Sequence, residues 1–331
     1  MWTTAGRWVG LLGVCGLAAS AVAGDYRPPR TASGVPDLDG TWTNNSLTML
    51  ERPDELKTLV IPPSEARAWE APRLGKPPEL PDDNVGGAES EWWDTDVGLA
   101  RIRGQARTSW IVQPTDGQRP FNAAAKAARK VRSERRKVDF DHPESRPAGE
   151  RCLEAAAAPP LQNGGYNDNF QFVQTRDHIA IVSEYMGELR IVRLGETRHP
   201  PKAVRLRMGD SLGRWEGDTL VIETTNFPAE EVEAPDGDPQ ADMRVVERIT
   251  RTSPTELHYA FRVENPAVYA QSWQGEMVFR ALTQPTFEFA CHEGNYSMPN
   301  ILAGARQQEA VAMAPGATQP AAPAQGPAAA R

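Results

Sequence analysis

The stretch MRVVERITRTSPTELHYAFRVEN, residues 243–265, carries the period-two pattern that decides the fold. Val245 and Ile249 share one face of its first half. In its second half, polar residues alternate with the apolar side chains of Leu257, Tyr259, Phe261 and Val263. Such alternation is typical of a strand with one buried and one solvated face. The stretch therefore predicts a β-hairpin.

Similar short runs flank this hairpin on both sides. They are HIAIVSEYMGELRIVRL at 178–194, RWEGDTLVIETTNF at 214–227, SWQGEMVFRAL at 272–282 and FEFACHEGNY at 287–296. Tight turns link the runs, and no helical pattern between them offers the crossover that parallel neighbours need, so we predict an antiparallel meander. A meander must protect its edge strands, and we expect it to close into a barrel or a strongly curved sheet.

The region before the meander adds three expectations. Gly40-Thr41-Trp42 resembles the Gly-x-Trp with which lipocalin-like barrels begin. Residues 51–84 are rich in proline and poor in periodicity, which predicts an extended segment that wraps a surface. Residues 123–137, AAAKAARKVRSERRK, predict one short exposed helix. The predicted fold class is thus mainly β, a lipocalin-like barrel or curved sheet with an extended N-terminal segment and one short helix.

Composition divides the chain of 331 residues into four parts. Residues 1–23 place a basic residue, an apolar segment and small residues in the order of a secretory signal peptide, and a disordered apolar N-terminus is the alternative. Residues 24–36 are a polar linker. Residues 37–306 are expected to form a single β-rich domain, with the meander at about 165–296. Residues 307–331 are an Ala/Pro-rich tail, which we expect to be disordered.

The cysteine count indicates the cellular compartment, and the charge limits the classes of binding partner. Cleavage of the signal peptide leaves Cys152 and Cys291, whose pairing is the simplest expectation in the periplasm or outside the cell; two buried free thiols are the alternative. No later segment approaches the roughly 20 apolar residues that span a bilayer. The formal charge is -8 with both signs interspersed, which argues against nucleic acid as a partner. The basic stretch at 123–137 is more often only a solvated helix face.

Three stretches carry a resemblance that covers roughly residues 149–306. They are MGDSLGRWEGDTLVIETTNF at 208–227, FEFACHEGNYSMPNILAGAR at 287–306, and GERC at 149–152 followed by GYNDNFQFVQT at 165–175. Together they resemble a large family of secreted bacterial proteins whose members have no assigned activity. The resemblance implies secretion and brings no reaction with it. Members of that family carry a histidine where this chain has Gly187, so the resemblance implies no mechanism that needs a histidine there.

The run FEFACHEGNY combines a cysteine, a histidine and a carboxylate. If it forms the last strand, Phe287, Phe289, Cys291 and Glu293 share one face and His292 lies on the other. The apolar neighbours favour a structural cysteine over a reactive thiolate, which needs electropositive and accessible surroundings. His292 leaves the apolar face where the strand ends, and a histidine beside a carboxylate can move a proton near neutral pH. The alternative is a histidine whose hydrogen bonds hold the following turn.

Glu184 is the best candidate for a catalytic carboxylate. We expect it in mid-strand on an otherwise apolar face, where desolvation would raise its pKa and suit it to acid or base catalysis. The structural alternative is a buried ion pair with Arg190 across the bend at Gly187. Together with His292, Glu184 forms the candidate catalytic pair.

The stretch GYNDNFQ, residues 165–171, is dense in amides. Amides beside an aromatic ring suit hydrogen bonding and stacking to a polyol or carbohydrate, although a solvated loop is the commoner outcome. The candidate ligand-binding residues are Tyr166, Asn167, Arg190, Glu293 and Tyr296. The sequence contains no dinucleotide, phosphate-loop or nucleophile-elbow motif, and its five histidines contain no pair at helical metal-binding spacing. We therefore expect neither a cofactor nor a metal.

Two functions remain. The first is a secreted or periplasmic β-barrel protein that binds a small organic or carbohydrate-like ligand. The second is a cofactor-independent hydrolase or lyase in which Glu184 and His292 act as acid and base. They differ in whether these two residues share one cavity within hydrogen-bond or one-water reach of a substrate.

Overall fold

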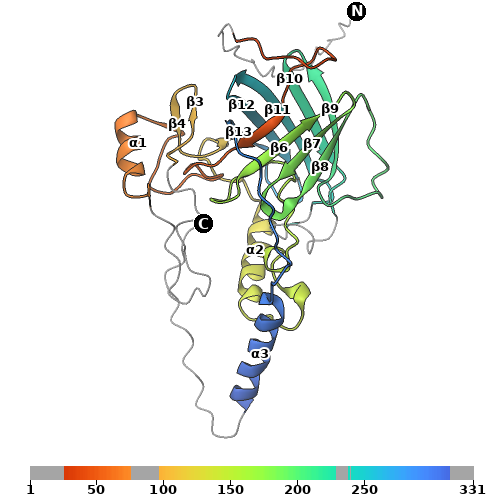
Figure 1. Cartoon of the computed structure of the whole chain (residues 1–331). Helices are drawn as coiled ribbons and strands as arrows, with labels where there is room; N and C mark the ends of the chain where they lie inside the picture. The colour runs from red at the N-terminus through yellow and green to blue at the C-terminus, as the bar shows by residue number, and fades with distance from the viewer. Residues whose placement is uncertain (1–25, 76–96, 229–237, 239, 314–331) are drawn as a thin grey trace, which may run out of the picture.

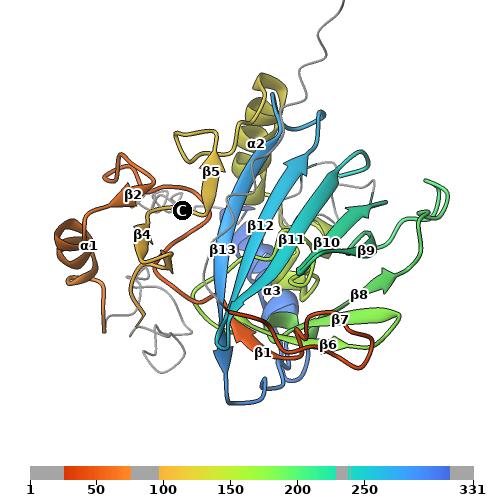
Figure 2. The same ribbon diagram turned by 90° about the horizontal axis from the view of Figure 1, so that it is seen from above.

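The computed structural model describes residues 26–75, 97–228, 238 and 240–313, so the predicted signal peptide lies outside the described residues. The described chain is mainly β, and its centre is a closed barrel of nine strands (Figures 1 and 2). The predicted fold class is confirmed. The barrel strands are β1 (Gly40–Thr43), β6 (Asn169–Gln174), β7 (His178–Ser183), β8 (Leu189–Leu194), β9 (Asp210–Glu216), β10 (Thr219–Thr225), β11 (Arg244–Ser253), β12 (Glu256–Glu264) and β13 (Trp273–Leu282).

Strand β1 closes the barrel because it pairs on both sides. Thr41 lies opposite Gln171 of β6 and opposite Leu282 of β13. The hairpin predicted for residues 243–265 is β11–β12, in which Ile249 faces Tyr259. Closure leaves β1 and β13 without the unpaired edge that an open meander would expose.

One neighbouring pair differs from the predicted antiparallel pattern. Strands β8 and β9 are parallel, with Val192 opposite Ser211 and Leu194 opposite Gly213. The connection, residues 195–209, contains no helix. A connection of this length can span the roughly 20 Å of a six-residue strand without a helix. The chain therefore returns to the end of the barrel where β8 begins and enters β9 from there.

Aromatic side chains pack inside the barrel. The Phe279 ring lies 5.6 Å from both Phe170 and Tyr259, and Phe261 lies 5.5 Å from Trp273, each as ring centroid distances. All five side chains are buried, and the three pairs meet edge to face, which is a favoured arrangement for aromatic rings. The inward faces of β6, β12 and β13 therefore form a packed core.

Buried chain segments cover both ends of the barrel. At the end where β1 begins, Leu38 is fully buried and its carbonyl accepts the Trp42 indole N–H at 3.0 Å. At the opposite end, the fully buried Leu161 donates its backbone N–H to the Tyr259 hydroxyl at 3.0 Å. Segments from outside the barrel thus complete the hydrogen bonding of groups at its two ends.

A small second sheet lies beside the barrel. It consists of β2 (Val60–Ile61), β4 (Gln105–Arg107) and β3 (Arg101–Ile102), next to helix α1 (Pro63–Glu70), while β5 (Ile111–Gln113) pairs with β13. The proline-rich segment 51–84 therefore forms a short strand and a helix within its described part, residues 51–75.

Two further helices extend from the end of the barrel where β6 begins (Figure 1). Helix α2 (Ala123–Arg136) is the predicted exposed helix, and Asn122 caps it by accepting the N–H of Ala125. Helix α3 (Ser297–Met313) was not predicted, and it includes the first seven residues of the tail expected to be disordered. Short 3-10 turns lie at η2 (Pro143–Ser145), η3 (Gly149–Arg151) and η4 (Tyr185–Gly187).

The prediction of a last strand at residues 287–296 is wrong. The final barrel strand ends at Leu282, and the chain then leaves the barrel as an irregular segment, residues 283–296, which we call the C-terminal strap. Phe287 is 69% exposed, so it does not share a buried face with Cys291. Because β13 already pairs with β12, β1 and β5, the barrel offers no free edge to which this apolar alternation can add.

Candidate functional site

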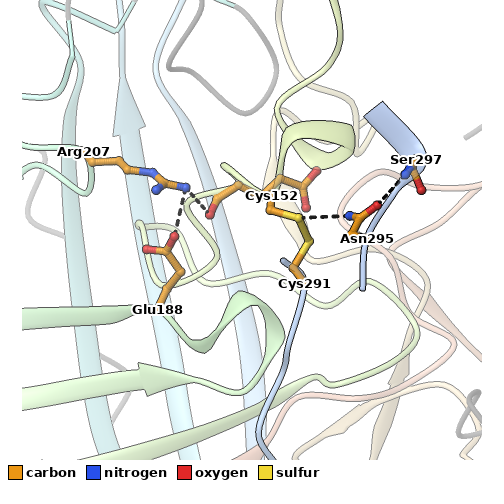
Figure 3. Close-up of a disulfide and its surroundings, with 7 residues drawn as sticks. Cys152, Glu188, Arg207, Cys291, Asn295 and Ser297 are labelled. Carbon is orange, nitrogen blue, oxygen red and sulfur yellow. Dashed lines mark hydrogen bonds and ion pairs between the residues drawn. A yellow bond between two sulfur atoms is a disulfide. The ribbon is translucent and has the colours of Figure 1, made fainter. Parts of the chain in front are cut away.

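A disulfide joins the C-terminal strap to the loop that follows η3. Cys152 and Cys291 are bonded, with their Cα atoms 5.8 Å apart, which confirms the predicted pair (Figure 3). The side-chain amide of Asn295 donates to Cys152 Sγ at 3.4 Å, and its oxygen accepts the Ser297 N–H that opens α3 at 2.9 Å. The disulfide therefore also positions the start of α3.

Glu184 holds the same strap. Its Oε2 accepts the backbone N–H of Phe287 at 3.0 Å, and its Oε1 accepts the side-chain amides of Asn167 at 2.7 Å and Asn169 at 3.1 Å. The residue is buried as expected, but it lies one position beyond β7 rather than in mid-strand. Both carboxyl oxygens thus have donors, and these donors account for the burial of the polar group.

Arg190 is not the partner of Glu184. It points into the barrel, where two of its nitrogens each lie 2.9 Å from a carboxylate oxygen of Glu247. The Tyr259 hydroxyl donates to Glu247 at 2.8 Å, and desolvation followed by the charge of Glu247 raises the pKa of Tyr259 well above its usual value. This buried group joins β8, β11 and β12, so the alternative of a Glu184–Arg190 pair is wrong.

Three aromatic rings line up beside Glu184. The Tyr185 ring lies 5.5 Å from Tyr166 and 5.0 Å from Phe289, in edge-to-face contact with both. Tyr166 comes from the loop before β6, Tyr185 from the β7–β8 turn and Phe289 from the strap. All three are partly exposed, so these segments, distant in sequence, share one aromatic surface.

Charged groups adjoin these rings. Desolvation and a hydrogen bond to Glu154 raise the pKa of Tyr185 far above its usual value, so the phenol keeps its proton. Burial also raises the pKa of Glu188, against the opposing charge of Arg207 at 2.9 Å. Arg207 donates to the backbone carbonyl of Glu154 at 2.7 Å as well. We refer to Tyr166, Tyr185, Phe289, Glu154, Glu188 and Arg207 as the Tyr185 cluster.

The backbone around this cluster is strained. Five non-glycine residues of the described chain have positive φ, and three of them, Cys152, Asn167 and Met186, adjoin the cluster with φ of 55°, 53° and 62°. Such conformations persist only where the surroundings enforce them, and they concentrate at functional sites. Strain, aromatic rings and shifted pKa values therefore coincide at one end of the barrel.

The remaining predicted site residues lie apart from this cluster. His292, Glu293 and Tyr296 are exposed on the strap beyond the disulfide, and Tyr296 is 71% exposed. Among the described residues, no hydrogen bond or ion pair joins His292 to Glu184. The structure thus brings Tyr166 and Asn167 to Glu184 and places Arg190 inside the barrel.

Of the Tyr185 cluster, only Tyr166 was predicted from the sequence as a site residue. Tyr185 continues the alternation of the buried side chains of β7, so its spacing indicates a structural residue. Glu154, Glu188 and Arg207 lie in segments without periodicity. The only local signal is the turn at Met186 and Gly187, which places Tyr185 at a strand end. Functional side chains often lie in the loops at strand ends. The order of residues alone does not show which of these loops lie next to one another.

Two pockets open elsewhere on the surface. One of about 450 Å³ is bounded by β2, the β3–β4 hairpin and the start of α1, and one of about 120 Å³ lies between Asn44 and Arg280. Neither is lined by a member of the Tyr185 cluster. In residues 26–75, 97–228, 238 and 240–313 there is no group of three or more His, Cys, Asp or Glu side chains arranged to hold a metal, and no helix long and apolar enough to cross a bilayer.

No family model matches the chain, and no curated protein matches it with significant similarity.

Proposed function

We propose that this chain is an exported β-barrel protein that binds a small, polyhydroxylated ligand of carbohydrate type on the Tyr185 cluster. The observation that carries the proposal is the half-buried row Tyr166–Tyr185–Phe289 beside the Glu154 and Glu188 carboxyl groups and the Arg207 guanidinium. Aromatic faces pack against sugar C–H groups, and the neighbouring polar groups supply directional hydrogen bonds to hydroxyls.

The packed interior of the barrel favours this outer surface over a central ligand chamber. Arg190 and Tyr259 both bond Glu247 inside, and the Leu161 N–H bonds the Tyr259 hydroxyl. A ligand in the interior would have to displace these contacts. A ligand on the Tyr185 cluster would not.

Export is part of the proposal. The Cys152–Cys291 bond supports it, because structural disulfides persist in oxidising compartments and are rare in the cytosol. The composition of residues 1–23 supports it as well. N-terminal sequencing of the exported protein tests it; a mature chain that still begins at Met1 would refute cleavage.

A hydrolase or lyase that uses Glu184 and His292 is the second candidate. The burial of Glu184 favours it. Its three hydrogen-bond donors weaken it, because they occupy both oxygens of a carboxyl group that would have to reach a substrate proton. Within the described residues, no hydrogen bond or ion pair joins His292 to Glu184. We therefore rank ligand binding first.

Thermal shift with a panel of monosaccharides, disaccharides and small polyols tests the binding function, since a ligand that binds only the folded state raises the melting temperature. Tyr185→Phe removes the hydroxyl and keeps the ring contacts, and we expect it to weaken binding about 10-fold. Tyr269→Phe is the matched control, because Tyr269 packs against Phe121 and Trp273 outside the cluster. Equal loss in both variants, or no shift with any sugar or polyol, overturns the proposal.

Glu188→Gln separates binding from stability. Burial raises the pKa of Glu188 in the folded state, so its stabilising contribution is present at low pH and is lost as pH rises through the folded pKa. At neutral pH we expect Glu188→Gln to keep or raise the melting temperature while ligand binding weakens. Glu196→Gln, in the exposed loop where Glu196 pairs with Arg193, is the control and should change neither.

A further inference from the structure

Lysine and small apolar side chains alternate along the outward side of α2 and the turn that follows it. Lys126 and Lys130 recur at helical spacing on α2, and Ala127 and Val131 repeat that spacing one residue later; Lys137, the C-cap, and Val138 follow in the turn. Val131 is 68% exposed and Val138 is 77% exposed. A row of cations thus borders a row of bare apolar side chains.

The opposite side of α2 fixes this orientation. Ala125 is buried, and Arg129 and Arg132 lie 2.6 Å and 3.1 Å from the carboxylate of Asp238. Arg129 also lies over the Phe121 ring, 4.4 Å from its centroid. These contacts hold α2 by its opposite side and leave its lysines and Val131 exposed. Figure 1 shows the helix extending away from the end of the barrel.

The charge of this helix opposes that of the whole protein. Residues 123–137 contain seven basic residues and one glutamate, although the chain has a formal charge of -8. Arg135 pairs with the partly buried Asp139, and Lys137 pairs with the exposed Glu134. In the described part of the chain, the ammonium groups of Lys126 and Lys130 form no salt bridge.

We propose that the outward side of α2 docks the protein on an anionic phospholipid surface. The lysines would lie at the phosphate level, where each cation near an anionic bilayer contributes to binding. Val131 and Val138 would enter the boundary between head groups and acyl chains, as the apolar side of an interfacial helix does. A soluble polyanion would use the lysines alone, so the two exposed valines favour a lipid surface.

Co-sedimentation of the full mature chain with vesicles tests the proposal. We expect binding to mixed phosphatidylglycerol and phosphatidylcholine vesicles at low salt, and not to phosphatidylcholine alone. Lys126→Glu/Lys130→Glu should weaken binding about tenfold or more. The matched control, Lys202→Glu/Arg262→Glu, changes the net charge by the same amount at exposed positions away from α2 and should bind as the original protein does.

A second variant tests the apolar row. Val131→Ser/Val138→Ser should reduce the bound fraction that survives raised salt, because salt screens the lysines and leaves apolar contacts intact. Circular dichroism confirms that each variant is folded. Failure of the original protein to bind anionic vesicles, equal binding to phosphatidylcholine, equal losses in the two charge variants, or an unchanged bound fraction in the serine variant overturns the proposal.

Discussion

The backbone N–H of Phe287 donates to the Glu184 carboxylate at 3.0 Å, although 103 positions separate the two residues. This bond, the Phe289–Tyr185 ring contact and the Cys152–Cys291 disulfide together hold the C-terminal strap over the β7–β8 turn. The strap in turn supplies one ring of the Tyr185 cluster. The candidate binding surface therefore depends on contacts that sequence distance conceals.

Replacement of Glu184 tests whether its role is structural. We expect Glu184→Gln to lower the free energy of unfolding by about 1–3 kcal/mol, because an amide cannot accept from all three donors. His292→Asn, at an exposed position, should change it by less than about 0.5 kcal/mol. Urea unfolding measures both. If Glu184→Gln and His292→Asn both keep full stability and both abolish binding or turnover, the acid–base candidate regains its support.

Loss of the disulfide should destabilise the protein strongly. Cys152 and Cys291 are separated by 139 positions, and the loop-closure entropy of so long a loop corresponds to about 5 kcal/mol. We expect Cys152→Ser/Cys291→Ser to lower the free energy of unfolding by about this amount. Urea unfolding of the variant and the original protein measures the difference. Thiol titration of the denatured, unreduced original protein should find no free thiol at either position; two thiols at these positions would contradict the bond.

The buried Arg190–Glu247 pair should behave unlike a surface pair. Glu247→Gln leaves the Arg190 charge uncompensated in the barrel and should cost about 3–5 kcal/mol. Arg190→Met/Glu247→Leu removes both charges and should cost less than the single change. Glu216→Gln weakens exposed pairs with Arg214 and Arg248 and should cost about 0–1 kcal/mol. Urea unfolding of the three variants checks this order, and a single change no worse than the surface control would contradict it.

Glu276 should make stability depend on pH in the acid range. Desolvation alone would raise its pKa, but the His258 hydrogen bond and the Arg107 charge outweigh it and hold the pKa below its usual value. A depressed folded pKa stabilises the protein above the unfolded pKa, and that stabilisation is lost as pH falls through the folded pKa.

The expected consequence is a cost for Glu276→Gln of about 1.5–3 kcal/mol at neutral pH that shrinks below about pH 4. Urea unfolding of both proteins across this range measures it. The exposed Glu288→Gln variant is the control and should show no such trend. A cost that does not vary with pH would show that the carboxylate charge of Glu276 is not what stabilises the fold.

Local periodicity by itself determined the β-hairpin at 243–265, the mainly β class and the basic helix at 123–137. Each depends on side chains close in sequence, such as Val245 and Ile249 on one strand face. The disulfide was also predictable, because Cys152 and Cys291 are the only cysteines after Cys15, which lies in the predicted signal peptide.

Only the tertiary structure decided what the alternation in FEFACHEGNY becomes. A strand forms where an edge offers free N–H and C=O groups, and β1 had already closed the barrel on β13, so Phe287 donates to Glu184 instead. The partner of Arg190 was decided in the same way. The register of β8, β11 and β12 places Glu247 and Tyr259 beside it inside the barrel, whereas Glu184, nearer in sequence, lies beyond the end of β7. Pairing across a closed sheet depends on strand order and closure, which no local pattern of residues encodes.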